Sequence, residues 1–241
     1  MQNKQPKVNL LKPDQNLVAK LLKEEQDDRY RYLVRNSILH YVEQDTWTLY
    51  VELKQIPNIM IVYRRPYERL KNADKMNLED RGFKRLPLLE GEEKIKYLNL
   101  SKNSITRIEN VVSLPNLTFL DLSSNKIMEI ITQPIVKSLR VLILAKNSIQ
   151  EIKNLECMPN LDVLDLHDNK IKKIDYLGAI QSLRVLNLSN NLIEVLEIAY
   201  PLPSLVELNL RKNQIKEVKD LKELVNLQKL YLSGNKIVNF N

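Results

Sequence analysis

Residues 161–171 read LDVLDLHDNKI, and residues 183–193 read LRVLNLSNNLI. The two segments align at a spacing of 22 residues, which brings their asparagines into register. This asparagine recurs at the same spacing, at Asn103, Asn125, Asn147, Asn169, Asn191, Asn213 and Asn235. Leucine stands three and five residues before each of them, and isoleucine stands two residues after. Seven consecutive matches to L-x-L-x-x-N-x-I identify a structural repeat, and this repeat decides the fold.

The spacing also predicts how one repeat folds. The two leucines alternate with polar residues, which is the pattern of a short strand with one buried face. One strand cannot bury that face alone, so successive repeats must stack into a parallel sheet over a continuous apolar interior. We expect each asparagine to be structural, because its amide can donate to and accept from the backbone of its own and adjacent coils. The short unit leaves room for only a turn of 3₁₀ helix on the other side.

The pattern is identified as the leucine-rich repeat, and it predicts an α/β solenoid over residues 76–241. We expect a curved right-handed stack with short parallel strands on the concave face and 3₁₀ turns or loops on the convex face. One register before the regular repeats, Arg81 replaces the asparagine while Leu78 and Leu86 keep apolar positions. We interpret this segment as a degenerate repeat that caps the N-terminal end.

The sequence stops at Asn241, inside the last repeat. An open solenoid end would leave Leu230, Leu232 and Ile237 without a neighbouring coil. We therefore expect this end to be covered by a partner or by further chain. The alternative is that the open edge is tolerated in solution.

Residues 1–75 contain no repeat and are interpreted as an N-terminal arm with a disordered start over residues 1–14. Apolar residues at helical spacing then predict a helix that continues through Ile38 and Tyr41, and the alternation that starts at Trp47 predicts a short extended segment. The arm either packs on the solenoid as a cap or anchors it to a large partner. The anchoring role would fall to aromatic side chains, which are Tyr30, Tyr32, Tyr41, Trp47 and Tyr50.

Composition excludes several classes of function. Four glycines in 241 residues are about a quarter of ordinary usage, which counts against glycine-rich phosphate loops. The single cysteine, Cys157, excludes a disulfide framework and indicates a reducing compartment. No apolar run approaches the roughly 18 residues that a membrane span needs, and the polar N-terminus is not a signal peptide.

No catalytic or cofactor motif stands out, so we expect no enzymatic activity, no metal and no cofactor. His167 lies between Asp165 and Asp168, a set that could suit acid–base or metal chemistry. These positions belong to the outer strand slots of one repeat, where polar residues are usual. We therefore interpret His167 as a solvated or partner-facing residue.

The variable strand positions predict the binding surface. Residues six before the repeated asparagines form an apolar column, with polar and charged residues in the two columns beside it. Such a surface usually marks a protein interface, although valine also suits a strand for its own sake. The candidate contact residues are Tyr97, Phe119, Asp121, Val141, Ile143, Val163, Asp165, His167, Val185, Arg211, Lys229 and Tyr231.

The net charge of +7 is spread along the chain, with many lysines in the loops after the strands. This distribution favours an acidic protein partner. Nucleic acid is not expected as a partner, because it would want a denser basic stripe interleaved with aromatic residues.

Three segments carry a closer resemblance. NLDVLDLHDN at 160–169, LRVLNL at 183–188 and LNLRKNQI at 208–215 resemble the leucine-rich-repeat subunit of the tubulin polyglutamylase complex. The approach through LEDR at 78–81 and LPLLEGEE at 86–93 is also similar to that family. The regular 22-residue form is similar, more broadly, to cytosolic leucine-rich-repeat regulators of protein phosphatase-1 and to axonemal dynein light chains.

The resemblance implies a non-catalytic subunit of the cytoplasm and cytoskeleton, associated with microtubules, cilia or axonemes, with tubulin or axonemal chains as partners. Together with the repeat, it predicts a scaffold that binds protein in such an assembly, for example a tubulin-modifying complex. Two alternatives remain open. One is a regulatory subunit of a protein phosphatase, and the other is an RNA-processing leucine-rich-repeat protein, which would bind RNA with a steep salt dependence.

Overall fold

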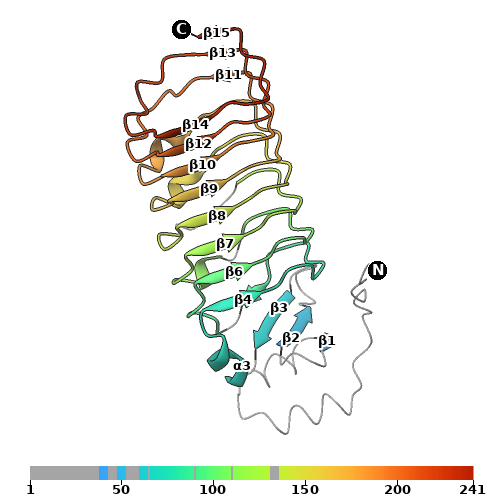
Figure 1. The fold of residues 1–241 in the computed structure, drawn as a ribbon. Coiled ribbons are helices and arrows are strands. Elements are labelled where there is room, and N and C mark those ends of the chain that lie inside the picture. The colour runs from blue at the N-terminus through green and yellow to red at the C-terminus, as the bar shows by residue number, and fades with distance from the viewer. Residues whose placement is uncertain are drawn as a thin grey trace.

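The computed structural model describes residues 38–42, 48–52, 60–64, 66–89, 91–109, 111–130 and 136–240. The chain winds into a stack of coils, each of which contributes one short strand to a common sheet (Figure 1). Eight of these strands form one parallel sheet. In sequence order they are β4 (Lys75–Asn77), β6 (Tyr97–Asn99), β7 (Phe119–Asp121), β8 (Val141–Ile143), β9 (Val163–Asp165), β10 (Val185–Asn187), β12 (Glu207–Asn209) and β14 (Lys229–Tyr231). The predicted parallel-strand solenoid is confirmed.

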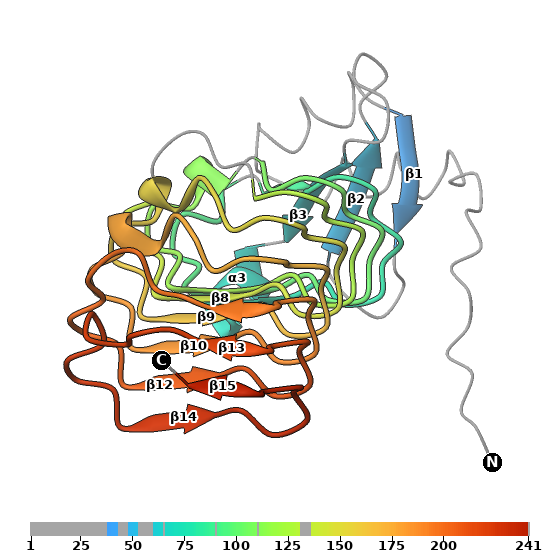
Figure 2. The same cartoon turned by 90° about the horizontal axis from the view of Figure 1, so that it is seen from above.

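The 22-residue period of the sequence sets the register of this sheet. Each strand pairs with its neighbour so that residues 22 apart face each other, as Leu98 faces Leu120 and Leu120 faces Leu142. The central leucine of each strand is buried from β6 to β12, while its two neighbours are half-buried or exposed. Figure 2 shows the coils one behind another when the stack is seen from above. An unbroken 22-residue spacing therefore carries every strand into line.

The core runs through the whole stack. Apolar residues that flank the asparagines of successive coils form one cluster from Val62 to Leu224. In the described part of the chain, three coils cross the far side of this core as 3₁₀ helices, which are η1 (Val111–Ser113), η2 (Leu155–Cys157) and η3 (Leu177–Ala179). The expected short 3₁₀ turns are therefore present. In the last coil the equivalent core residues are only partly buried, namely Leu227, Leu230, Leu232 and Ile237.

The last coils contain a second parallel sheet that the sequence analysis did not predict. It has three strands, which are β11 (Val195–Leu196), β13 (Glu217–Val218) and β15 (Asn239–Phe240). They begin four residues after the repeated asparagine. The earlier coils have a buried isoleucine at the position of Leu196 and Val218, for example Ile152, but form no strand there.

The repeated asparagines bind adjacent coils together. Asn125 donates to the carbonyl oxygens of Leu122 in its own coil and of Leu100 in the preceding coil, each at 3.0 Å. Its Oδ1 atom accepts from the backbone amide of Ile105, also in the preceding coil, at 2.9 Å. Equivalent bonds recur along the stack, and we call this series the asparagine ladder, made of Asn103, Asn125, Asn147, Asn169, Asn191, Asn213 and Asn235.

Each ladder asparagine thus forms hydrogen bonds with the backbone of the coil before it. Asn103 accepts from the amides of Arg81 and Phe83 in the degenerate coil, at 2.9 and 3.1 Å. The strand of that coil, β4, is the edge of the eight-stranded sheet. No earlier coil of the sheet requires an amide from position 81, and this explains why arginine can replace asparagine there.

The N-terminal arm contributes three strands, β1 (Ile38–Val42), β2 (Thr48–Glu52) and β3 (Met60–Arg64), and one short helix, α3 (Pro66–Lys71). The predicted helix through Ile38 and Tyr41 is wrong at these residues, because β1 pairs antiparallel with β2. A short apolar run fits either period, and here pairing with a partner strand decides. The extended segment expected after Trp47 corresponds to β2. Residues 1–37, with the expected disordered start and the rest of the predicted helix, lie outside the described residues.

Strand pairing and a buried ion pair fasten the arm to the stack. Strand β3 pairs parallel with β5 (Leu88–Leu89), which follows the degenerate coil. Arg64 is 4% exposed, and its Nε donates to Oε1 of Glu92, itself 2% exposed, at 2.9 Å. Another guanidinium nitrogen, Nη1, donates to the carbonyls of Asn72 and Lys75 at 2.8 and 3.0 Å. One side chain thus ties together β3, the end of α3 and the first strand of the solenoid.

Candidate protein-binding surface

The outer side of the eight-stranded sheet carries an apolar row. It consists of the first residues of five consecutive strands, which are Tyr97, Phe119, Val141, Val163 and Val185. Tyr97 is 45% exposed, and the other four are half-buried. The Tyr97 and Phe119 rings lie 6.0 Å apart between centroids, and the Lys75 amine lies 5.4 Å above the Tyr97 ring. The sheet register therefore joins these five residues into one continuous strip.

At the C-terminal strands, charged residues replace the apolar residues of the row. Glu207 and Lys229 take over the same column, and the Lys229 amine lies 3.2 Å from the Glu207 carboxylate. This hydrogen bond raises the pKa of the Lys229 amine. Beside them, the Arg211 guanidinium lies 4.2 Å from the centre of the Tyr231 ring. The predicted residues of this end thus form two cross-coil pairs.

The next column has a structural role that the sequence analysis missed. The Oδ1 atom of Asp121 accepts from the backbone amide of Ser123 at 2.8 Å, and that of Asp165 accepts from His167 at 3.0 Å. The amide oxygens of Asn99, Asn187 and Asn209 make the same bond to the residue two positions on. These Asx turns end the strands that carry Asp or Asn at this position. A run of Asp and Asn at this position, two residues before a loop, was the signal that could have revealed them.

Ile143 departs from that pattern. It occupies the Asx position between Asp121 and Asp165, where a side chain with an oxygen would accept a hydrogen bond. Isoleucine cannot accept one, and its side chain remains half-buried beside Val141 on the outer face. The hydrogen bonding of its own coil therefore does not explain Ile143.

His167 lies where the sequence places it, next to two carboxylates. Its Nδ1 atom is 2.8 Å from Oδ1 of Asp165, and its Nε2 atom is 3.6 Å from Oδ2 of Asp168. Across the described residues, no group of three or more His, Cys, Asp or Glu side chains is arranged to hold a metal ion. Asp165 already accepts from the backbone, so the arrangement holds the imidazole in place on the outer face.

The aromatic residues of the arm are only partly described. Tyr41 lies in β1 and Tyr50 in β2, where the two residues face each other across the strand pair. Tyr30, Tyr32 and Trp47 fall outside the described residues. Their role in anchoring a partner therefore stays a prediction.

The edge of the stack next to the asparagine ladder has an unusual backbone. The residue directly before each ladder position has a left-handed conformation, with φ of 54° to 57° in seven coils. Only the last coil has glycine there, at Gly234 with φ of 77°. The other seven residues are Asp80, Lys102, Ser124, Lys146, Asp168, Asn190 and Lys212. This turn cannot be predicted from the sequence, because lysine gives no signal for a positive φ.

An open pocket lies on the side of η2 and η3, away from the strand face. Its volume is about 650 Å³, and Tyr176 and Tyr200 line it together with Glu151 and Lys153. The Lys153 amine lies 3.4 Å from Glu151, which raises the pKa of that amine.

None of the helices in the described part of the chain has the length and apolar character that a membrane crossing requires.

Comparison with known families agrees with this geometry. The model "Leucine Rich repeats (2 copies)" matches residues 93–134 and 137–179, and the model "Leucine rich repeat" matches residues 181–237. The chain belongs to the leucine-rich-repeat family. Proteins of this family serve as modules for protein–protein interaction, and the fold is typically non-catalytic.

Curated leucine-rich-repeat proteins match over a short stretch. Human leucine-rich repeat-containing protein 49 is 38% identical over 70 residues, which are 29% of this chain and 10% of that protein. The mouse protein of the same name is 46% identical over 64 residues, which are 27% of this chain and 9% of that protein. The matched stretch thus spans about a tenth of the length of these relatives.

The solved leucine-rich-repeat domain of APL1B shares the fold. It has a TM-score of 0.57 and 19% sequence identity, and the alignment covers 73% of this chain and 59% of that chain. At this identity the likeness concerns the architecture alone. It agrees with the stacked parallel strands of the described residues.

Proposed function

We propose that this leucine-rich-repeat protein is a non-catalytic scaffold that binds a protein partner across the apolar row of its strand face. The observation that supports this most directly is the row itself, from Tyr97 to Val185, with Ile143 beside it. These side chains are partly exposed in five adjacent strands. Contiguous apolar area of this kind is expensive to leave in water and is typical of interfaces.

The residues of the apolar row would contribute unequally to the binding free energy. Tyr97 and Phe119 are the large, rigid members, and aromatic anchors usually contribute most of the binding free energy. Ile143 extends the apolar area into the next column, where β6 and β7 carry Asx turns. Asp121, Asp165, His167, Arg211, Lys229 and Tyr231 would form the polar rim.

We place this scaffold in a microtubule-associated, axonemal or ciliary assembly, such as a tubulin-modifying complex of the cytoplasm and cytoskeleton. The resemblance of residues 160–169, 183–188 and 208–215 to the leucine-rich-repeat subunit of the tubulin polyglutamylase complex supports this setting. In this proposal tubulin or axonemal chains are the partners, and the ligase activity belongs to another chain.

The test is affinity capture from a ciliated-cell extract with the 241-residue chain, read by quantitative mass spectrometry. We expect the double variant Phe119→Asp, Ile143→Asp to lose at least about tenfold of the captured tubulin or axonemal chains, because charge would be buried against an apolar partner. The matched control is Val225→Asp, since Val225 is 72% exposed and lies off the strand face.

Unchanged capture by a folded double variant would contradict binding through the apolar row. Capture of a phosphatase catalytic subunit in place of tubulin or axonemal chains would keep the row but favour the alternative of a phosphatase regulator. Thermal unfolding monitored by circular dichroism checks that each variant is folded.

A further inference from the structure

Lysines line the edge of the stack next to the asparagine ladder. Each stands directly before or directly after a ladder asparagine, and each is exposed. We call this set the lysine row, and it consists of Lys126, Lys146, Lys170, Lys212 and Lys236. Five of the seven regular coils thus contribute to the row. The first regular coil also has a lysine beside its ladder asparagine, Lys102, but the amine of Lys102 lies 2.7 Å from the Glu79 carboxylate.

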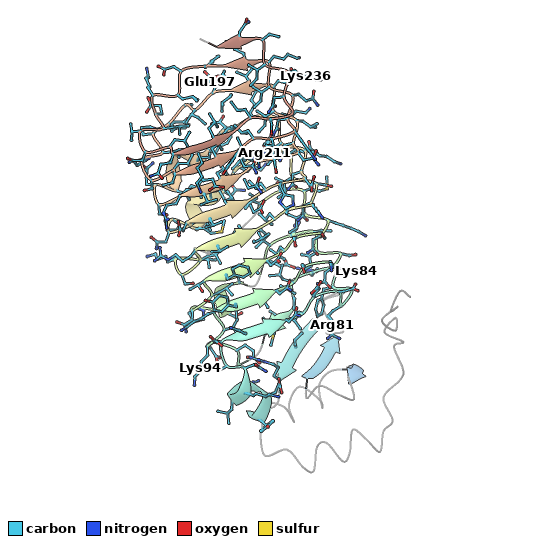
Figure 3. The ribbon with its side chains drawn as sticks, in the orientation of Figure 1. Arg81, Lys84, Lys94, Glu197, Arg211 and Lys236 are labelled. Carbon is cyan, nitrogen blue, oxygen red and sulfur yellow. The ribbon has the colours of Figure 1, made fainter. Side chains whose placement is uncertain are left out.

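Backbone hydrogen bonds hold the row at the spacing of the coils. The amides of Lys146 and Lys212 donate to His167 and Ser233 of the following coil, both at 2.9 Å. The amide of Lys170 donates to Ile149 of the preceding coil at 2.8 Å. Neighbouring coils are about 4.8 Å apart, so the row extends over about 24 Å from its first to its last lysine. Figure 3 shows Lys236 near the C-terminal end of this side of the stack and Lys84 near the other end.

The lysines of this row differ from several lysines elsewhere that pair with a glutamate. Lys216, Lys219 and Lys229 each bridge to a glutamate of the preceding coil, at 3.0, 3.1 and 3.2 Å. No member of the lysine row has a carboxylate oxygen within 4 Å among the described residues. Several lysines away from the ladder are thus neutralised across coils, whereas the five lysines of the row form a file of positive charges without a counterion among the described residues.

Two members of the row also occupy costly backbone positions. Lys146 and Lys212 have φ of 55° and 54°. A left-handed conformation costs about 1–2 kcal/mol for a residue with a Cβ atom, and glycine or asparagine would reduce that cost. Strain of this kind persists at sites that use it. Keeping lysine there maintains the positive charge at the expense of stability.

We propose that the lysine row binds an extended acidic segment, a run of Glu and Asp residues in a protein partner. An extended chain advances about 3.3 Å per residue, so eight residues would cover the row. The file is narrow, and no residue flanking the ladder asparagines is aromatic. A single row of lysines without aromatic side chains suits the carboxylates of an acidic peptide better than nucleic acid. Single-stranded nucleic acid binds through aromatic stacking as well as charge.

A carboxylate and a coil without a lysine interrupt the lysine row in its middle. Asp168 precedes its ladder asparagine, next to Lys170, and Asn190 of the following coil bonds to its carboxylate. The next coil has Asn190 and Leu192 in place of a lysine. The bound segment therefore makes its closest contacts at two stretches, one at Lys126 and Lys146 and the other at Lys212 and Lys236.

The test measures fluorescence anisotropy of a labelled peptide of ten glutamates with the 241-residue chain at low ionic strength. We expect binding that weakens with added salt and that falls about tenfold in the triple variant Lys126→Gln, Lys146→Gln, Lys212→Gln, since each exposed ion pair contributes modestly. The matched control is Lys153→Gln, Lys219→Gln, Lys222→Gln. It removes the same charge from paired lysines and should change the affinity less than about twofold.

Two further probes define the outcome. A ten-glutamine peptide should not bind, and a ten-nucleotide single-stranded RNA should bind more weakly than the glutamate peptide. Equal losses in both triple variants would show binding to net charge alone and overturn the proposal. Absence of glutamate binding at low salt, or tighter RNA binding that the row variant removes, would also overturn it.

Discussion

The N-terminal cap and the regular coils are held together in different ways. The cap, by which we mean the described part of the arm and the degenerate coil, depends on the pairing of β3 with β5 and on a buried ion pair. In this pair Arg64 reaches Glu92 across 28 positions of sequence and also satisfies the carbonyls of Asn72 and Lys75. The coils depend on the asparagine ladder, where the same set of hydrogen bonds recurs with every neighbour. Cohesion is therefore concentrated in the cap and distributed in the coils. Single substitutions should have unequal effects in the two regions.

The largest effect is expected in the cap. Glu92→Gln keeps the shape of the side chain but leaves the buried Arg64 guanidinium without its counterion. Breaking a buried pair in this way costs about 3–5 kcal/mol. Urea unfolding followed by circular dichroism measures the loss. The exposed pair Arg184–Asp162, at 3.5 Å, supplies the control, since Arg184→Gln should cost less than about 1 kcal/mol. Similar losses in both variants would mean that the buried pair does not fasten the cap.

The ladder should show a gradient between its middle and its end. Asn169 is 8% exposed and donates to Leu144 and Leu166 at 2.9 and 3.0 Å. We expect Asn169→Ala to reduce the free energy of unfolding by about 2–4 kcal/mol, because buried backbone groups lose their partners. Asn235 makes the same bonds but is half-buried, so water can replace them. Asn235→Ala should cost about 1 kcal/mol in the same urea titration. A cost at Asn235 as large as at Asn169 would contradict this explanation.

The smallest effect tests the left-handed turn. Lys146→Gly should raise the unfolding free energy by up to about 1 kcal/mol, because glycine adopts a positive φ without strain. Lys126→Gly removes the same side chain in the neighbouring coil, where φ is not positive, and should lower it by about 0.5–1 kcal/mol. Opposite signs in differential scanning calorimetry would confirm strain at Lys146, and equal signs would exclude it.

The sequence predicts the solenoid well because its evidence is repeated. Leucine, asparagine and isoleucine recur at one period, and each strand pairs at that period without a shift. The secondary structure of the arm was harder to predict, since the spacing around Ile38 and Tyr41 fits a helix as well as a strand. A partner strand distant in sequence settles that choice.

The candidate surface follows the same division. The apolar row could be predicted from the sequence, since alternation in a strand fixes which side chains share a face. The Asx turns of Asp121 and Asp165 were missed, because their hydrogen bonds to residues two positions on depend on how each strand ends. The lysine row was seen only as scattered charge. Which lysines pair with a carboxylate of the preceding coil, and which line up along the ladder without one, is decided by the stack.

The sequence by itself determined the repeat, the number of regular coils and the residues that face the core, because period and polarity are local properties of the chain. Only the tertiary structure decided that Glu92 meets Arg64, that lysines occupy left-handed turns, and that some amines are paired while others form an open file. These features depend on contacts between coils and on backbone angles, which a pattern of residue types does not encode. The physical reason is that burial can be anticipated one residue at a time, whereas pairing requires two residues to be placed in space.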